Sequence, residues 1–225
     1  MNTSIVDYLP LLLRAAGITL WLSWLALVIG TVGGTGLALL RTSRFAALRL
    51  IAILYIEFFR SIPILIVLFF SYFGLPLVLG IEMSPFAAAT VALAAHAVAT
   101  MSEVVRAGLE SVGRGQWEAA HSQGMSTPQV LRYVVFPQAI RVILPPSVGV
   151  FITVLKESSL ASVIGYIELT KTGLLVREST DGGFAPLLVL AVLYFVINYA
   201  ISLVGAVLER RFNVGRRDAL AGGMA

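Results

Sequence analysis

The sequence predicts an all-helical integral membrane protein with about five transmembrane helices. Of its 225 residues, 58% are hydrophobic and only 12% are charged, whereas soluble domains are about 45–50% apolar and about 25% charged. The apolar runs are long enough for membrane-spanning helices, and they far exceed the roughly 10-residue alternating segments of a transmembrane barrel. Because backbone polar groups in lipid must be satisfied within the protein, we expect helices to form the spans.

We expect one transmembrane domain, residues 1–225, whose spans follow the apolar runs. The predicted spans cover about residues 15–40, 51–76, 84–107, 141–165 and 184–207. A polar segment, about 108–140, separates the third span from the fourth. The start of the chain contains Asp7 and has no basic region before its first apolar run, so we expect the first helix to remain in the mature protein.

The distribution of basic residues predicts the orientation in the membrane. One set of loops and the tail contain Arg41, Arg44, Arg49, Arg114, Arg132, Arg210, Arg211, Arg216 and Arg217. The other set contains Arg14, Lys171 and Arg177 together with Asp7, Glu82, Glu168, Glu178 and Asp181. Since cytoplasmic loops carry an excess of Lys and Arg, we expect the first set in the cytoplasm. The N-terminus then lies outside and the C-terminus lies in the cytoplasm.

Several function classes are disfavoured by what the sequence lacks. The absence of cysteine excludes a disulfide framework, Cys-ligated metal and thiol catalysis. No Gly-x-Ser-x-Gly or His-Glu-x-x-His motif supports an intramembrane enzyme, although Ser102, His96 and Glu103 lie in a predicted span. The run GTVGGTG (30–36) lacks the Gly-Lys-Ser/Thr ending of a phosphate loop, and its glycines predict a helix-packing face instead.

The stretch GQWEAAHSQGMS (115–126) predicts a short helix, a glycine turn and the start of a second helix. Good helix formers precede Gly124, which is typical of a residue that ends a helix. Thr127 then resembles an N-cap, followed by Pro128 at the first helical position. The small side chains of Ala119 and Ala120 would allow another backbone to come close, but these residues alone also allow a solvated loop helix.

Three segments of the chain resemble the permease subunits of type I ABC importers, in particular the polar amino acid permeases. EAAHSQG (118–124) fits their Glu-Ala-Ala-x-x-x-Gly signature, and the surrounding residues 106–146 resemble their cytoplasmic loop. EFFRSIPILIVLFF (57–70) and LKESSLASVIG (155–165) resemble parts of their second and fourth spans. The resemblance covers roughly residues 15–210, with the three segments in the family's order.

The resemblance implies that the polar stretch is a coupling helix whose contact residues are Glu118, Ala119, Ala120 and Gly124. It implies a dimer of separate ATP-binding subunits that bind ATP and Mg, while this chain itself has no cofactor, no metal and no catalytic activity. It also implies a second permease chain, the same or related, and an extracytoplasmic solute-binding protein. The solute would be a polar amino acid that crosses a bacterial cytoplasmic membrane by alternating access.

Ionisable residues within the spans are candidates for the solute path, because such groups face the protein interior or a wet cavity. Glu57 with Arg60 and Glu103 with Arg106 are spaced to pair on one helix face, and we expect both pairs near the cytoplasmic ends of their spans. Lys156 lies near mid-membrane. It is followed by Glu157, Ser158 and Ser159, and His96 lies on an otherwise apolar face.

Several alternatives remain open from the sequence. The mid-membrane charges could bind a zwitterionic solute or only pair with each other, and His96 could bond a neighbouring helix. The solute could be another small molecule, such as methionine or an opine. An ATP-independent channel and an intramembrane enzyme are the competing function classes. A membrane protein with this charge distribution gives no reason to expect a nucleic acid partner; lipid and a small solute are the expected ones.

Overall fold

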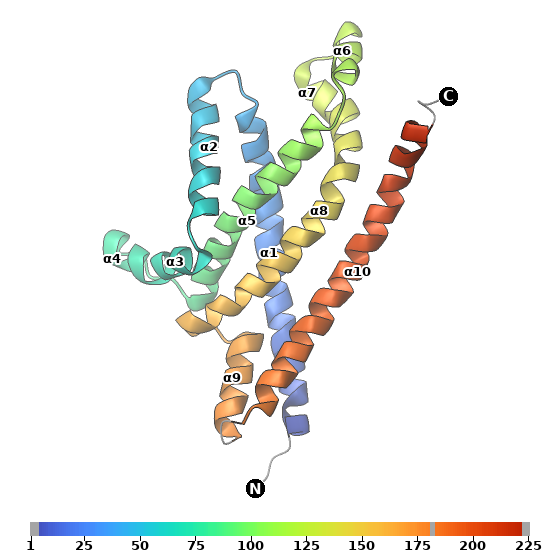
Figure 1. The fold of residues 1–225 in the computed structure, drawn as a ribbon. Coiled ribbons are helices and arrows are strands. Elements are labelled where there is room, and N and C mark those ends of the chain that lie inside the picture. Colours follow the sequence, from blue (N-terminus) through green and yellow to red (C-terminus); the bar gives the residue numbers. More distant parts are fainter. Residues whose placement is uncertain (1–4, 181–182, 222–225) are drawn as a thin grey trace.

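The computed structural model describes residues 5–180 and 183–221, and every regular element within them is helical (Figure 1). The helices are α1 (Leu9–Arg41), α2 (Ala46–Ser61), α3 (Ile64–Phe69), α4 (Leu75–Leu79), α5 (Pro85–Glu110), α6 (Arg114–Ser122), α7 (Thr127–Val130), α8 (Phe136–Glu157), α9 (Leu169–Ser179) and α10 (Ala185–Ala221). Asp181 and the side chains of Arg216 and Arg217, used above to predict orientation, lie outside what is described.

The prediction of about five spans is confirmed. Four helical segments are long and apolar enough to cross a membrane: Leu9–Arg41, Pro85–Glu110, Thr127–Ile164 and Ala185–Phe212. The fourth predicted span is thus the end of a longer segment, because α7 continues through a π-helical turn at Leu131–Val135 into α8. A 3-10 helix, Ser158–Ile164, extends it further. Little of the α10 span is buried inside the chain, so its apolar surface is available to lipid.

The second predicted span, about 51–76, differs from the structure. The helix begins earlier, at Ala46, and the chain bends by 103° between Ala46–Ser61 and Ile64–Leu79. The reason is Pro63, which has no backbone N–H and disfavours helical geometry in the residue before it. Ile62 is accordingly extended, with φ −93° and ψ 132°. The two arms count as one span only if the bent pair crosses the membrane as a unit.

The core of the chain is the contact between α1 and α5, which cross in the middle of the molecule (Figure 1). Gly30 and Gly34 lie on the buried face of α1, as the sequence predicted. A Cβ atom added at Gly34 would lie 2.8 Å from the Met101 Cβ atom, and one at Gly30 would lie 2.6 Å from that of Ala97. Only glycine allows so close a backbone approach, which is the usual way that membrane helices pack.

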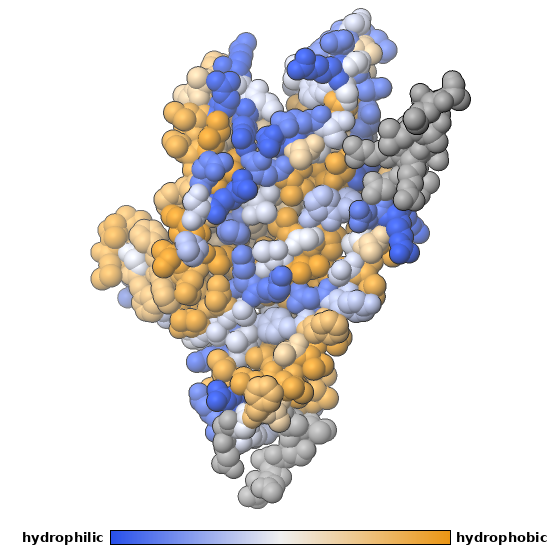
Figure 2. All heavy atoms as spheres, in the orientation of Figure 1, coloured by the Kyte–Doolittle hydropathy of each residue, from blue (hydrophilic) through white to orange (hydrophobic). Residues whose placement is uncertain are grey.

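The two ends of the molecule differ, and we name them by their helices. At the α6 end lie α6, α7 and the connection from α1 to α2; at the α9 end lie α9 and the start of α1 (Figure 1). Figure 2 shows hydrophilic residues gathered at the α6 end, whereas hydrophobic residues cover the side formed by α3 and α4 and much of the surface toward the α9 end. The start of α1 and the end of α10 lie at opposite ends, which agrees with an odd number of crossings.

Candidate functional site

The polar stretch forms the helix, turn and second helix that the sequence predicted, and it projects at the α6 end (Figure 1). Gly124 takes a φ of +79°, a left-handed conformation that favours glycine. Its backbone N–H donates to the His121 carbonyl at 2.9 Å, and the Met125 N–H donates to the Ala120 carbonyl at 3.3 Å. These bonds satisfy carbonyls at the end of α6, so the turn is fixed by the chain itself.

The second helix starts one residue earlier than predicted, because Ser126 rather than Thr127 is the N-cap. The Gln129 side chain explains why Ser126 is the N-cap. Its Oε1 atom accepts hydrogen bonds from the backbone N–H of Ser126 at 2.8 Å and from the Ser126 hydroxyl at 2.9 Å. A glutamine at the third helical position that bonds back to the N-cap is half of a capping box. Pro128 still lies in the first turn, where its missing N–H costs nothing.

The two alanines of this stretch differ in exposure. Glu118 and Ala119 are exposed, as is Gly124. Ala120 is only 5% exposed and packs in the core of its own chain, in a cluster that includes Val130 and Val135. Residues 118 and 119 therefore present a free surface at the tip of the molecule, whereas Ala120 fastens α6 to the helix that follows.

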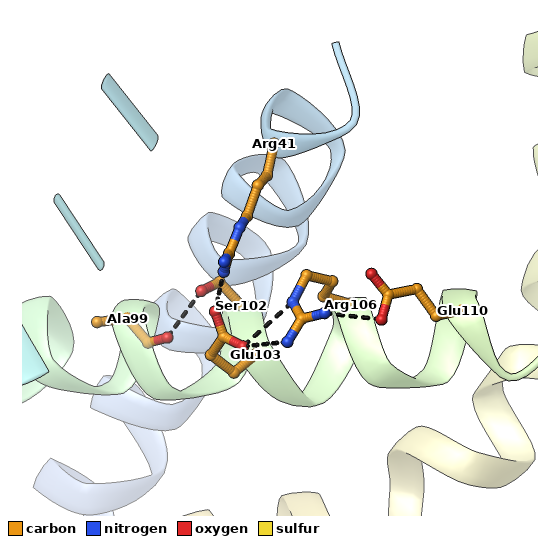
Figure 3. Close-up of polar contacts among 6 residues, drawn as sticks. All are labelled: Arg41, Ala99, Ser102, Glu103, Arg106 and Glu110. Atoms are coloured by element: carbon orange, nitrogen blue, oxygen red, sulfur yellow. Dashed lines mark hydrogen bonds and ion pairs between the residues drawn. The ribbon is translucent and has the colours of Figure 1, made fainter. Parts of the chain in front are cut away.

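An ion-pair chain at the α6 end joins α1 to α5 (Figure 3). Glu103 pairs with Arg106 at 2.6 Å, as its spacing predicted, and also with Arg41 at the end of α1. Arg106 pairs further with Glu110 at 2.7 Å. The pairing with Arg41 bridges 62 residues of sequence, and no local pattern indicated it. All of these side chains are partly or largely exposed.

The predicted pair of Glu57 and Arg60 does not form, since within the described residues no ion pair joins them. Both side chains are exposed in the single chain. They also lie away from the α6 end, in the last turns of α2 beside the bend at Pro63. We expected them near the cytoplasmic end of their span. The structure places them in the last turns of α2, away from the connection between α1 and α2, because the helix starts at Ala46 rather than near residue 51.

His96 connects three helices. Its Nδ1 atom lies 3.2 Å from the Phe59 carbonyl on α2, so that nitrogen carries the proton that is donated. Its Nε2 atom faces Glu157 on α8, 3.7 Å from Oε1. The other carboxylate oxygen of Glu157, Oε2, is buried and has no hydrogen-bond partner in the described part of the chain. Such an atom costs free energy unless a donor reaches it.

The four residues 156–159 do not act as one cluster. Lys156 points away from Glu157 into a crevice of about 490 Å³ between α8 and α10, which Tyr194 and Asn198 also line. The Ser158 hydroxyl is buried and donates to the Leu155 carbonyl at 2.8 Å, while Ser159 donates to the Lys156 carbonyl at 2.6 Å. Both serine hydroxyls therefore bond within their own helix, and Glu157 is the member with an unpaired acceptor.

A second polar junction, at the α9 end, was not predicted from the sequence. The loop expected after the fourth span contains α9, and the side chain of Glu168 caps it by accepting from the N–H groups of Thr170 at 2.9 Å and Lys171 at 2.8 Å. Glu168 is fully buried and also accepts from Thr19 of α1 and Tyr194 of α10, at 3.3 and 3.1 Å. Burial raises the pKa of this carboxyl, and the four hydrogen bonds oppose that rise. One carboxylate thus joins three helices.

This geometry defines a class: a multi-pass membrane protein with an exposed helix-turn-helix at one end and, between its helices, a half-buried carboxylate with one unpaired oxygen. The chain belongs to the family of binding-protein-dependent transport system inner membrane components, whose model matches residues 26–214. It is therefore a membrane transport subunit of an ABC transporter and not a catalytic enzyme, and this class works together with other transporter components. Within the described residues, no group of three or more His, Asp or Glu side chains could hold a metal ion.

Within this family, the chain is similar to permeases of amino-acid ABC transporters. It is 35% identical over 212 residues to the probable amino-acid ABC transporter permease protein YckA of Bacillus subtilis (strain 168), covering 94% of this chain and 93% of that one. It is 38% identical over 197 residues to that organism's probable glutamine ABC transporter permease protein GlnP, covering 86% and 90%. A solved structure titled as an amino acid ABC transporter with histidines matches with a TM-score of 0.85 and 38% identity, over 94% of this chain and 100% of that one.

Proposed function

We propose that this chain forms half of the translocation path of an ATP-driven importer for polar amino acids in a bacterial cytoplasmic membrane. The observation that carries the proposal is the exposed tip of α6, where Glu118 and Ala119 are free and the positive φ of Gly124 turns the chain back. The similarity to amino-acid permeases supports the solute class. The α6 end then faces the cytoplasm, as the basic loop residues predict.

The tip of α6 is where we place the docking of a separate ATP-binding subunit, which binds ATP and Mg. Glu118 and Ala119 make the contact, Gly124 allows the return of the chain, and Ala120 holds the helix on its own core. Two permease chains, identical or related, enclose the path, since twofold pairing is the usual arrangement. A solute-binding protein delivers the amino acid at the α9 end, and nucleotide-driven movement of the two α6 helices alternates access.

Single cysteines test the docking, because the chain has none of its own. Cysteine at Ala119, which is exposed, should cross-link to an ATP-binding subunit in native membranes. Cysteine at the adjacent Ala120 is the matched control: its 5% exposure should keep cross-linking low. Mass spectrometry identifies the attached chain. Capture of no ATP-binding subunit at position 119, in protein that elutes as one species, would instead support an ATP-independent channel.

We place the solute at Glu157, because its buried Oε2 atom lacks a hydrogen-bond donor that the ammonium group of an amino acid can supply. Glu157→Gln should raise the solute concentration for half-maximal uptake by about tenfold or more, since hydrogen bonds to charged groups are worth about 1.5–3 kcal/mol. Lys156→Gln is the neighbouring control, as that side chain faces α10. Unchanged uptake kinetics in Glu157→Gln would remove Glu157 from the solute path.

A further inference from the structure

A crevice of about 770 Å³ opens at the α9 end, beside the first half of α1. Its α1 wall is the helical face formed by Arg14, Gly17, Ile18 and Trp21, and the opposite wall comes from the start of α5 and from the segment before α9. The opposite wall consists of Ser84, Pro85, Phe86, Gly165, Tyr166 and Ile167. This volume is within the range of about 300–1,000 Å³ that is usual for small-molecule sites.

Arg14 is the charged residue of this lining, which contains no carboxylate. Its side chain is exposed, and among the described residues it has no hydrogen-bond or ion-pair partner. Its neighbours Leu11 and Leu13 are 50% and 54% exposed, as expected on a surface that faces lipid. Arg14 lies five residues into α1, about 8 Å along the helix axis. Because Arg14 directly precedes the predicted first span, about 15–40, we expect its guanidinium at the level where lipid phosphates gather.

We propose that this crevice holds a membrane phospholipid, with its phosphate bound to Arg14 and an acyl chain along Ile18 and Trp21. A guanidinium fork matches phosphate oxygens in a bidentate way. Tyr166 is of the amphipathic aromatic type that gathers at the headgroup level of membranes, whereas Trp21, which is 55% exposed, offers its ring to the acyl chain. Gly17 provides the space between them, since a Cβ atom added there would meet nothing within 4 Å.

The side chains that line the crevice favour a phospholipid over the transported amino acid as its ligand. A zwitterionic amino acid needs an acceptor for its ammonium group as well as a cation for its carboxylate, and the lining offers one cation and mostly apolar side chains.

The bound lipid would also contact the junction at the α9 end. Gly165, Tyr166 and Ile167 directly precede Glu168, so the lipid lies against the junction between α1 and α9 and stabilises that junction from the membrane side.

Photo-cross-linking tests this site independently of transport. The complex that the full chain forms is reconstituted into vesicles of phosphatidylethanolamine and phosphatidylglycerol, with a trace of phosphatidylglycerol that carries a photoreactive acyl chain. Labelled peptides are quantified relative to peptides of α10, where exposed Phe195 and Tyr199 report general contact with lipid. We expect preferential labelling of peptides that contain Trp21 and Ile167.

Two variants and two controls decide the outcome. Gly17→Leu fills the crevice, and Gly36→Leu is its control on the same helix, since a Cβ atom at either glycine meets nothing within 4 Å. Arg14→Gln removes the charge and should lower crevice labelling by about fivefold, whereas Arg14→Lys should retain part of it. Equal labelling in Gly17→Leu and Gly36→Leu, or labelling in Arg14→Gln equal to that of the unchanged chain, overturns the proposal.

Discussion

The two ends of α1 are fastened in different ways. At the α6 end, Arg41 joins a chain of ion pairs with Glu103 and Arg106, whose side chains are 23–30% exposed. At the α9 end, Thr19 donates to Glu168, which is fully buried and accepts four hydrogen bonds. Charges near water attract each other weakly and are screened by salt, whereas buried polar groups are costly when left without partners. The α9 junction should therefore be the stronger fastening.

The largest expected effect comes from Glu168→Ala. The change removes the acceptor for two backbone N–H groups and two hydroxyls, and each buried group left unpaired costs about 1–3 kcal/mol. We expect a large loss of thermal stability of the purified protein, measured by the temperature at which it ceases to elute as one species. Glu168→Gln keeps one acceptor oxygen and should lose clearly less. Equal stability of Glu168→Ala and the unchanged chain would show that α9 is held by apolar packing alone.

A smaller effect is expected from Glu103→Gln, which breaks the pairs with Arg41 and Arg106 together. Ion pairs that water reaches contribute about 0–1 kcal/mol each, so the loss of these two partly exposed pairs should be at most about 2 kcal/mol. The loss should shrink as NaCl is raised, because salt screens exposed charges, whereas the loss in Glu168→Ala should stay constant. Salt-dependent melting of both variants thus compares the two junctions directly, and the same salt response in both would contradict the distinction.

The smallest effect is expected from Glu110→Gln, which removes the outer link of the ion-pair chain. The Glu110 side chain is 60% exposed, and helical pairs spaced by four residues are worth about 0.3–0.5 kcal/mol. The melting temperature should hardly change, and uptake should not change. A loss as large as that of Glu103→Gln would mean that the chain of pairs acts as one cooperative unit rather than as separate contacts.

Local patterns in the sequence were sufficient for much of the fold and for part of the candidate site. Apolar runs predicted the number of spans, and Gly124 marked the turn after α6. The spacing of Glu103 and Arg106 predicted their pairing. These features succeed because each depends on residues within a few positions of one another, where helix geometry alone fixes which side chains meet.

Other predictions failed where one local feature outweighed the pattern. Hydropathy across residues 51–76 indicated one span, yet the chain bends by 103° at Pro63, and Glu57 and Arg60 lie beside that bend. The stretch after the fourth span reads as a polar loop, yet it contains α9 because Glu168 supplies the cap from within the core. A glutamate in a polar sequence gives no sign that it is buried.

By itself, the sequence determined the membrane-spanning class, the approximate spans and the helix-turn-helix at the α6 end, because hydropathy and turn chemistry act locally. The tertiary structure decided which distant groups meet: Arg41 with Glu103, Glu157 with His96, and Glu168 with Thr19 across 149 residues. It also decided that Ala119 faces outward and Ala120 inward. The physical reason is that these contacts depend on which helix faces pack together. The glycines of α1 indicated a packing face, but only the structure shows that α5 is its partner.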